Sequence, residues 1–227
     1  MKSVALLTPL RSVLILSLLI ISIAGASFAL NEKSLAEQMG NRYGDDGRAL
    51  FNAWRALINQ GVNLTEQEQL NRVNDFFNRS IAFRTDLQQW QQQDYWATPL
   101  ETLGVGAADC EDYTIAKYIT LLKLGVPGDK LRLIYVKAQI GGPHSTFFQA
   151  HMVLGFYPTP HAEPLILDNL ITTIEPASKR PDLRPVFSFN DAGLWIGRDR
   201  ESRADPGARL SRWRDVLTRM RTEGFHP

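Results

Sequence analysis

Apolar residues recur at helical spacing in two stretches near the start of the chain. In residues 45–60 they mark one face of a helix that ends at Gly61: Leu50, Phe51, Trp54, Leu57 and Ile58. The capping-box pattern Thr65-Glu-Gln-Glu68 predicts the start of a second helix over about 66–80. The apolar face of this second helix contains Leu70, Val73, Phe76, Phe77 and Ile81. The apolar faces of both helices are expected to form part of the hydrophobic core.

From about residue 130 the pattern changes to short apolar runs rich in β-branched and aromatic residues, which predict strands. These runs are Leu131–Lys137, Ala150–Tyr157, Pro164–Asp168 and Pro185–Phe189. Pro158-Thr-Pro160 is expected to turn the chain between the second and third runs. Helices followed by a meander of strands predict an α+β fold with an antiparallel sheet.

Two polar stretches allow more than one interpretation. Residues 84–103 are rich in glutamine and contain aromatic residues that either line a cleft or belong to the core: Trp90, Tyr95 and Trp96. Residues 198–221 carry eight arginines interleaved with acids. They form a solvated helix face or, less favoured, a basic patch for an acidic partner. The apolar stripe of this segment predicts a further helix: Leu210, Trp213, Val216, Leu217 and Met220.

Residues 1–29 have the pattern of an export signal. Lys2 and Arg11 supply positive charge, residues 13–23 form an apolar run, and small residues suited to cleavage follow it. We expect cleavage after Ala29, while an uncleaved N-terminal anchor is the alternative. The mature protein is therefore expected in an exported compartment, most simply a bacterial periplasm.

The predicted mature domain, residues 30–227, has the size and apolar content of one globular domain. Without the signal, 23 basic residues face 24 acidic ones, a net charge of −1. This balance gives no support to nucleic-acid binding as the main role. The one cysteine, Cys110, excludes an internal disulfide, and an unpaired thiol in an oxidising compartment favours a functional role.

Cys110 lies where a third helix is predicted to begin. A Gly- and Ala-rich segment, residues 104–108, allows a tight turn before it, and Gly125 and Pro127 end the helix. Unpaired backbone N–H groups and the helix dipole stabilise an anion at a helix N-terminus. This position therefore suits a nucleophilic thiolate.

The chain has four histidines that could act as a base for this thiol: His144, His151, His161 and His226. Only His151 lies within an apolar strand, where a polar ring needs a partner. Antiparallel pairing centred between Thr159 and Pro160 would place His151 opposite Asp168, which closes the next strand. The sequence thus predicts a Cys-His-Asp triad, although each residue taken alone is more often a core or turn residue.

Three carboxylates surround the nucleophile: Asp109, Glu111 and Asp112. Like charge disfavours a thiolate and raises its pKa. Some of these acids suit helix capping, but together they also form part of an oxygen-rich site for a hard cation such as Ca²⁺. The spacing does not match an EF-hand loop, and zinc is less favoured because paired close ligands are missing.

Several segments together resemble the bacterial transglutaminase-like cysteine proteinases, the LapG-type periplasmic adhesin proteases. The resemblance extends over residues 40–197 and is carried by Thr98–Leu103, Ala108–Tyr113, Ile115–Tyr118, Ala150–Leu154, Leu165–Leu170 and Pro185–Asn190. It implies a papain-like, transglutaminase-core α+β fold. It also implies Cys110 as nucleophile, His151 as general base and acid, and Asp168 as the residue that orients His151.

The resemblance further implies a calcium-dependent protease. The acidic residues of the family that flank the nucleophile fall on Asp109 and Glu111, with Asp112 as a weaker third. The implied substrate is a large cell-surface adhesin of the repeats-in-toxin type, cut after a paired-alanine motif near its N-terminus. The implied inhibitory partner is the periplasmic domain of an inner-membrane cyclic-di-GMP receptor, so that low cyclic-di-GMP releases the protease and disperses biofilm.

Two other functions remain open on the residues alone. A transglutaminase-type acyl transferase would use the same triad and pass the acyl group to an amine instead of water. A non-catalytic periplasmic binding module would keep the fold and carry an inert thiol at Cys110.

Overall fold

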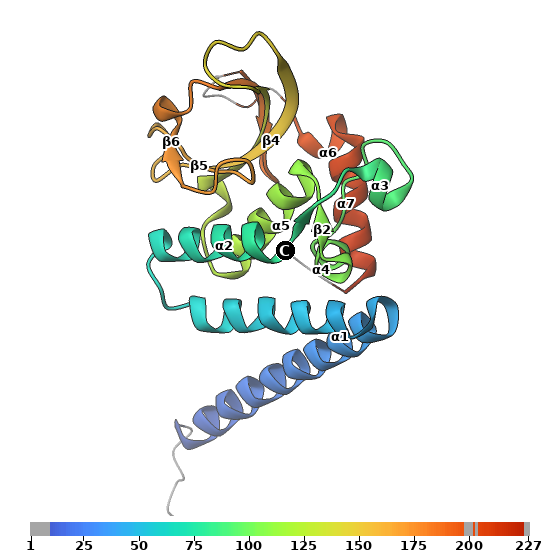
Figure 1. Cartoon of the computed structure of the whole chain (residues 1–227). Helices are drawn as coiled ribbons and strands as arrows, with labels where there is room; N and C mark the ends of the chain where they lie inside the picture. The colour runs from blue at the N-terminus through green and yellow to red at the C-terminus, as the bar shows by residue number, and fades with distance from the viewer. Residues whose placement is uncertain (1–9, 198–201, 203, 225–227) are drawn as a thin grey trace, which may run out of the picture.

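The computed structural model describes residues 10–197, 202 and 204–224, with side chains from residue 35 onward. Residues 1–9 of the predicted signal lie outside this range, and cleavage after Ala29 stays a prediction. Helices pack against a curved sheet, and α5 (Cys110–Lys123) lies between the two (Figure 1). Within the described residues no helix is long and apolar enough to cross a membrane.

The predicted helices are confirmed. The first forms the C-terminal part of α1 (Leu10–Gly61), beyond a kink at Gly44. The second is α2 (Glu66–Ser80), and its capping box between Thr65 and Glu68 is present. The remaining helical elements are α3 (Asp86–Trp90), α4 (Pro99–Val105), α6 (Pro206–Arg209), α7 (Ser211–Thr222) and the short 3-10 helices η1 (Gly128–Lys130) and η2 (Ala177–Lys179).

The main sheet is antiparallel, with strand order β6-β5-β4-β3-β7-β8. Its strands are β3 (Leu131–Gln139), β4 (Phe148–Phe156), β5 (Leu165–Leu167), β6 (Glu175–Pro176), β7 (Leu183–Phe189) and β8 (Leu194–Ile196). The first three are expected strands and pair in chain order, and β6, which was not predicted, adds to the free edge of β5. The chain then crosses over to place β7, the fourth predicted strand, on the free edge of β3. The α+β prediction is therefore confirmed, whereas a meander throughout is wrong.

The register between β4 and β5 differs from the prediction by two residues. Leu154 pairs with Leu167 and Phe156 with Leu165, so the pairing centre lies beyond the Pro158–Pro160 turn. The strands are joined by a longer irregular loop, which sets the register in place of a tight turn. A shift of two residues keeps each side chain on its original face. His151 and Asp168 therefore meet diagonally instead of directly opposite each other.

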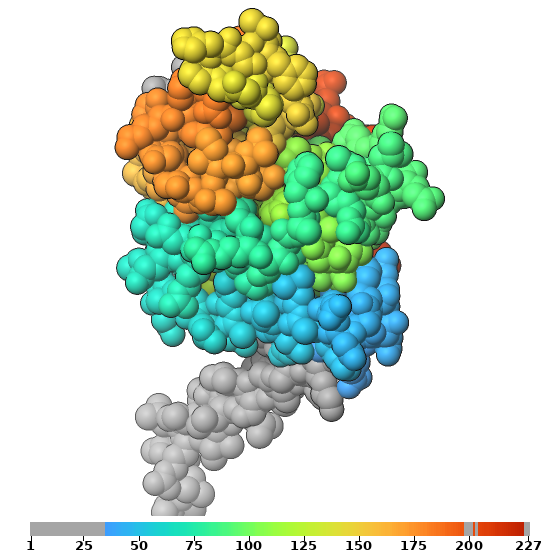
Figure 2. Space-filling view, viewed as in Figure 1, coloured from blue at the N-terminus to red at the C-terminus, as the bar shows by residue number. Residues whose placement is uncertain are grey.

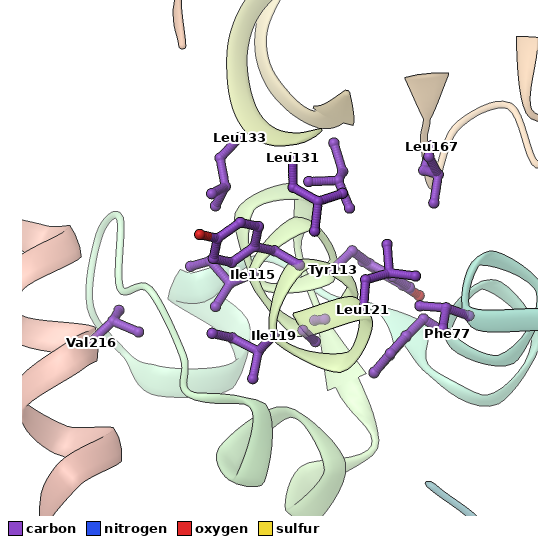
Figure 3. Packing of buried hydrophobic residues seen from close by; sticks show 14 of the residues in the cluster. Phe77, Tyr113, Ile115, Ile119, Leu121, Leu131, Leu133, Leu167 and Val216 are labelled. Carbon is purple, nitrogen blue, oxygen red and sulfur yellow. The ribbon is translucent and has the colours of Figure 1, made fainter. Parts of the chain in front are cut away.

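The hydrophobic core surrounds α5. Ile115 and Ile119 are fully buried on this helix, and Leu131 and Leu133 of β3 and Phe77 of α2 pack around it (Figure 3). In the space-filling view, α1 from residue 35 and α2 form one end of the molecule, and the segments around β4, β5 and β6 form the other (Figure 2). α5 is thus packed between the helices and the sheet.

Substitution at the centre of α5 tests this packing. Ile119 is fully buried, so Ile119→Ala is expected to lower the free energy of unfolding by about 2–5 kcal/mol, because it leaves a cavity. Leu122→Ala on the same helix is the control, since Leu122 is only partly buried and should cost less. Urea denaturation measures both values, and equal losses would contradict a core centred on Ile119.

The glutamine-rich stretch, residues 84–103, contacts the arginine-rich tail at α7. Its apolar stripe is buried through Trp213, Val216 and Met220. On the polar side Arg219 forms an ion pair with Glu101 and donates to the backbone carbonyl of Trp96. Some arginines of this tail therefore fix α7 to residues 94–101, which the sequence pattern did not indicate.

Candidate active site

Cys110 is the first residue of α5, as predicted. The chain reaches it from α4, which is capped by Gly106 in a left-handed conformation (φ 63°), through the short strand β2 (Ala107–Ala108). β2 pairs with β1 (Ala82–Phe83) in a parallel ladder, and this pairing holds the approach in place. The thiol therefore lies at a helix N-terminus, where backbone N–H groups have no partner within the helix.

His151 and Asp168 are hydrogen-bonded at a distance of 2.8 Å between Nε2 and Oδ1, which confirms their predicted contact. Both side chains are buried. Burial opposes ionisation of Asp168, but hydrogen bonds from His151, the Leu170 N–H and Arg180 outweigh it and lower its pKa to about 2. A carboxylate that binds Nε2–H leaves Nδ1 of His151 free to accept a proton.

Cys110 and His151 line the same cavity of about 740 Å³. The cavity lies between the N-terminus of α5, the start of β4 and the segment around α3, and Tyr135 and Phe187 form part of its wall. Trp96 both lines this cavity and stacks on Phe189, so one of the three aromatic residues of the 84–103 stretch lies at the cleft. The predicted nucleophile and base thus face one space that is open to a substrate.

A group of three carboxylates lies next to Cys110 in the sequence or lines its cavity: Asp86, Asp109 and Glu111. Their ligand atoms lie within 4.8 Å of one another, and one oxygen each of Asp86 and Asp109 is buried without a hydrogen-bond partner in the described structure. Burial and the neighbouring acids raise the pKa of Asp109 to about 10, and burial chiefly raises that of Asp86 to about 6. Unpaired buried oxygens of this kind fit a divalent cation.

Asp86 was not found by sequence reasoning, and Asp112 lies outside this group. The buried Asp112 carboxylate accepts a hydrogen bond of 2.6 Å from the N–H of Ala97 and so fixes the chain before α4. The structure therefore brings together Asp109 and Glu111 of the predicted metal ligands, with Asp86 as their third partner.

The acidic group also affects the thiol. Cys110 Sγ donates to Glu111 Oε2 at 2.8 Å. Burial, then the Glu111 charge and this hydrogen bond, raise the pKa of Cys110 well above its ordinary value. A cation held by the carboxylates would offset this repulsion and so lower the pKa of the Cys110 thiol.

Two further cations that sequence reasoning missed contact Asp168. Arg180 Nη2 donates to Oδ2 at 2.7 Å, and Lys117 Nζ donates to the backbone carbonyl at 3.1 Å. Both side chains are buried, and burial lowers the pKa of Lys117 to about 7. The only sequence signal for such partners is indirect, because a buried carboxylate at the end of a strand needs a charged or hydrogen-bonding neighbour.

The low pKa of Asp168 predicts acid sensitivity. Folding favours the ionised carboxylate, so its contribution is present above the unfolded pKa near 4 and is lost as the pH falls towards 2. Between pH 5 and pH 2 the wild type should lose about 2 kcal/mol more unfolding free energy than Asp168→Asn. Urea denaturation across this pH range measures the difference, and parallel curves would contradict the assignment.

A thiol at a helix N-terminus that shares a cavity with the histidine of a buried His-Asp pair is the arrangement of papain-like enzymes, which form an acyl-enzyme on cysteine. The chain matches the family model of the bacterial transglutaminase-like cysteine proteinases over residues 54–183. It is similar to the solved structure of Legionella pneumophila LapG, with 41% identity, a TM-score of 0.71 and coverage of 83% of this chain and 97% of that chain. The chain therefore belongs to the bacterial transglutaminase-like cysteine proteinases, and it is a cysteine protease.

Two further structures of this relative are similar to the same extent. The EGTA-treated form of L. pneumophila LapG is 42% identical, with a TM-score of 0.72 and coverage of 83% of this chain and 97% of that chain. The calcium-bound form is 43% identical, with a TM-score of 0.70 and coverage of 82% and 97%. No curated protein matches the chain significantly. The transglutaminase-like protease fold expected from the resemblance is thus confirmed.

Proposed function

We propose that this protein is a calcium-dependent periplasmic cysteine endopeptidase that releases a large surface adhesin. The observation that carries the proposal is the cavity shared by Cys110 and His151, with Asp168 bound to the far side of the imidazole. Family membership and the similarity to LapG support the same reaction class.

In the proposed mechanism Nδ1 of His151 takes the proton of the Cys110 thiol as the reaction begins, which gives a thiolate-imidazolium pair, and Asp168 stabilises the imidazolium. The thiolate attacks the scissile carbonyl, and the N–H of Cys110 at the helix start donates to the oxyanion. His151 then protonates the leaving amine and activates a water molecule, which hydrolyses the acyl-enzyme.

Calcium binding by Asp86, Asp109 and Glu111 supports this mechanism. When bound, Ca²⁺ would supply the positive charge that offsets the carboxylates around the thiol. The unpartnered oxygens of Asp86 and Asp109 fit such a cation, and the relative LapG has been solved in a calcium-bound form. We therefore assign calcium as the cofactor and these three side chains as its ligands.

Substrate and regulation follow from the family resemblance. We propose that the substrate is a repeats-in-toxin-type adhesin, cut after paired alanines near its N-terminus. The periplasmic domain of a cyclic-di-GMP receptor would sequester the protease, and its release would promote biofilm dispersal. The export pattern of residues 1–29 supports a periplasmic location.

The test is incubation of the mature protein with the N-terminal region of a paired-alanine adhesin, with calcium or with a chelator. Cleavage only in calcium supports both the protease and its cofactor. An intact adhesin, with a Cys110 thiol that still reacts with iodoacetamide, would overturn the substrate assignment. An intact adhesin and an inert thiol would instead favour the binding module, and incorporation of an added amine would identify an acyl transferase.

A further inference from the structure

The carboxylate of Asp168 has a different partner on each oxygen. Oδ1 accepts from His151 Nε2 at 2.8 Å and from the N–H of Leu170 at 3.0 Å. Oδ2 accepts from Arg180 Nη2 at 2.7 Å. Both oxygens of a fully buried carboxylate are therefore occupied, and the plane of the group is fixed by His151 on one side and Arg180 on the other.

The guanidinium of Arg180 is itself held in place. The side chain is 3% exposed, and Nη2 also donates to Asp182 Oδ2 at 2.8 Å, while Nε donates to Asp182 Oδ1 at 3.0 Å. This two-point contact orients the planar group, and Nη2 donates to both Asp182 and Asp168. His151, Asp168, Arg180 and Asp182 thus form a continuous hydrogen-bonded chain that is electrically neutral when His151 is protonated.

The other contacts of Asp168 do not hold its carboxylate. Lys117 Nζ and Asn78 Nδ2 both donate to the backbone carbonyl, at 3.1 and 2.8 Å. They position the chain at the end of β5, but they leave the side-chain torsion free. Arg180 is the side chain that binds Oδ2, while His151 and the N–H of Leu170 bind Oδ1.

We propose that Arg180 is a positioning residue of the protease, which orients the Asp168 carboxylate and through it the ring of His151. Arg180 lines a different cavity from the one that holds Cys110 and His151, so it acts through Asp168 instead of touching the substrate. The Nη2 hydrogen bond to Oδ2 holds the carboxylate with Oδ1 directed at Nε2–H, which leaves Nδ1 available for the thiol proton. The inference rests on the proposed triad and extends it by one residue.

The experiment compares Arg180→Gln, Arg180→Lys and Arg184→Gln in the full mature protein with calcium. Arg184 is the matched control because it is an exposed arginine of β7 that stacks on Phe148. The readouts are the histidine ring ¹⁵N spectrum, which reports the tautomer of His151, and the rate of Cys110 alkylation by iodoacetamide. Since Cys110 is the one cysteine of the chain, alkylation reports this thiol alone.

We expect wild type and Arg184→Gln to hold His151 in the Nε2–H tautomer. Arg180→Gln should mix the two tautomers and slow alkylation by about tenfold, a loss typical of removing a partner that orients a functional group. Arg180→Lys should restore much of both, because it keeps the charge but not the fork. If Arg180→Gln does not fold, Asp182→Asn should show the same changes to a smaller degree.

A folded Arg180→Gln protein with the wild-type tautomer and alkylation rate would overturn the positioning role and leave Arg180 as a stabilising residue only. Failure of the proposed function looks different. In that case His151→Ala would react with iodoacetamide as fast as the wild type, because the thiol would not depend on His151 at all.

Discussion

Cys110→Ala is expected to reduce peptide-bond cleavage by about 10⁴-fold or more, because removing a nucleophile leaves only binding and oxyanion stabilisation. His151→Ala and Asp168→Ala are expected to abolish cleavage as well, since the members of a triad act as a unit. Cleavage of the adhesin fragment, followed by gel electrophoresis over time, measures the effect.

Cys110→Ser is the matched control for this experiment. Serine keeps the size of the side chain and a weak nucleophile whose pKa lies far above that of a thiol, so this variant should also be inactive. Thermal unfolding should remain close to the wild type for both variants, because the Cys110 side chain is only partly buried. Retained cleavage by the alanine variant would disprove the nucleophile assignment.

The contact between His151 and Asp168 was predictable because it depends on local pattern. A polar ring within an apolar strand needs a partner, and the next strand ends in a carboxylate. The exact register was not predictable, because the loop between the two strands is irregular and its length does not define a turn type. The predicted contact is nevertheless correct, because a register error of two residues leaves both side chains on the same face of the sheet.

Asp86 and Arg180 were missed for a different physical reason. Asp86 lies 23 positions before Asp109 in the polar 84–103 stretch, and the parallel pairing of β1 with β2 brings this stretch next to Cys110. A parallel pair formed by two-residue strands has almost no sequence signal. Arg180 follows η2 in a loop, and its burial depends on the crossover of the chain to β7, which the pattern of a plain meander does not contain.

The carboxylate group in the structure contains Asp86, whereas the ligand set expected from the sequence contains Asp112 in its place. Asp86→Asn should weaken calcium binding by about 10-fold to 100-fold, since calcium affinity depends strongly on the number of charged ligands. Asp112→Asn should have a smaller effect, because an asparagine oxygen can still accept from the Ala97 N–H. Isothermal titration with calcium measures both affinities.

Asp94→Asn is the control for charge alone, because Asp94 lines the same cavity but pairs with Arg212 outside the carboxylate group. Calcium should stabilise wild type and Asp94→Asn against heat and should have much less effect on Asp86→Asn. The raised pKa values of Asp86 and Asp109 mean that calcium must displace protons, so wild-type affinity should increase with pH. If Asp86→Asn binds calcium as tightly as the wild type and Asp112→Asn binds it more weakly, then Asp112 and not Asp86 is the third calcium ligand.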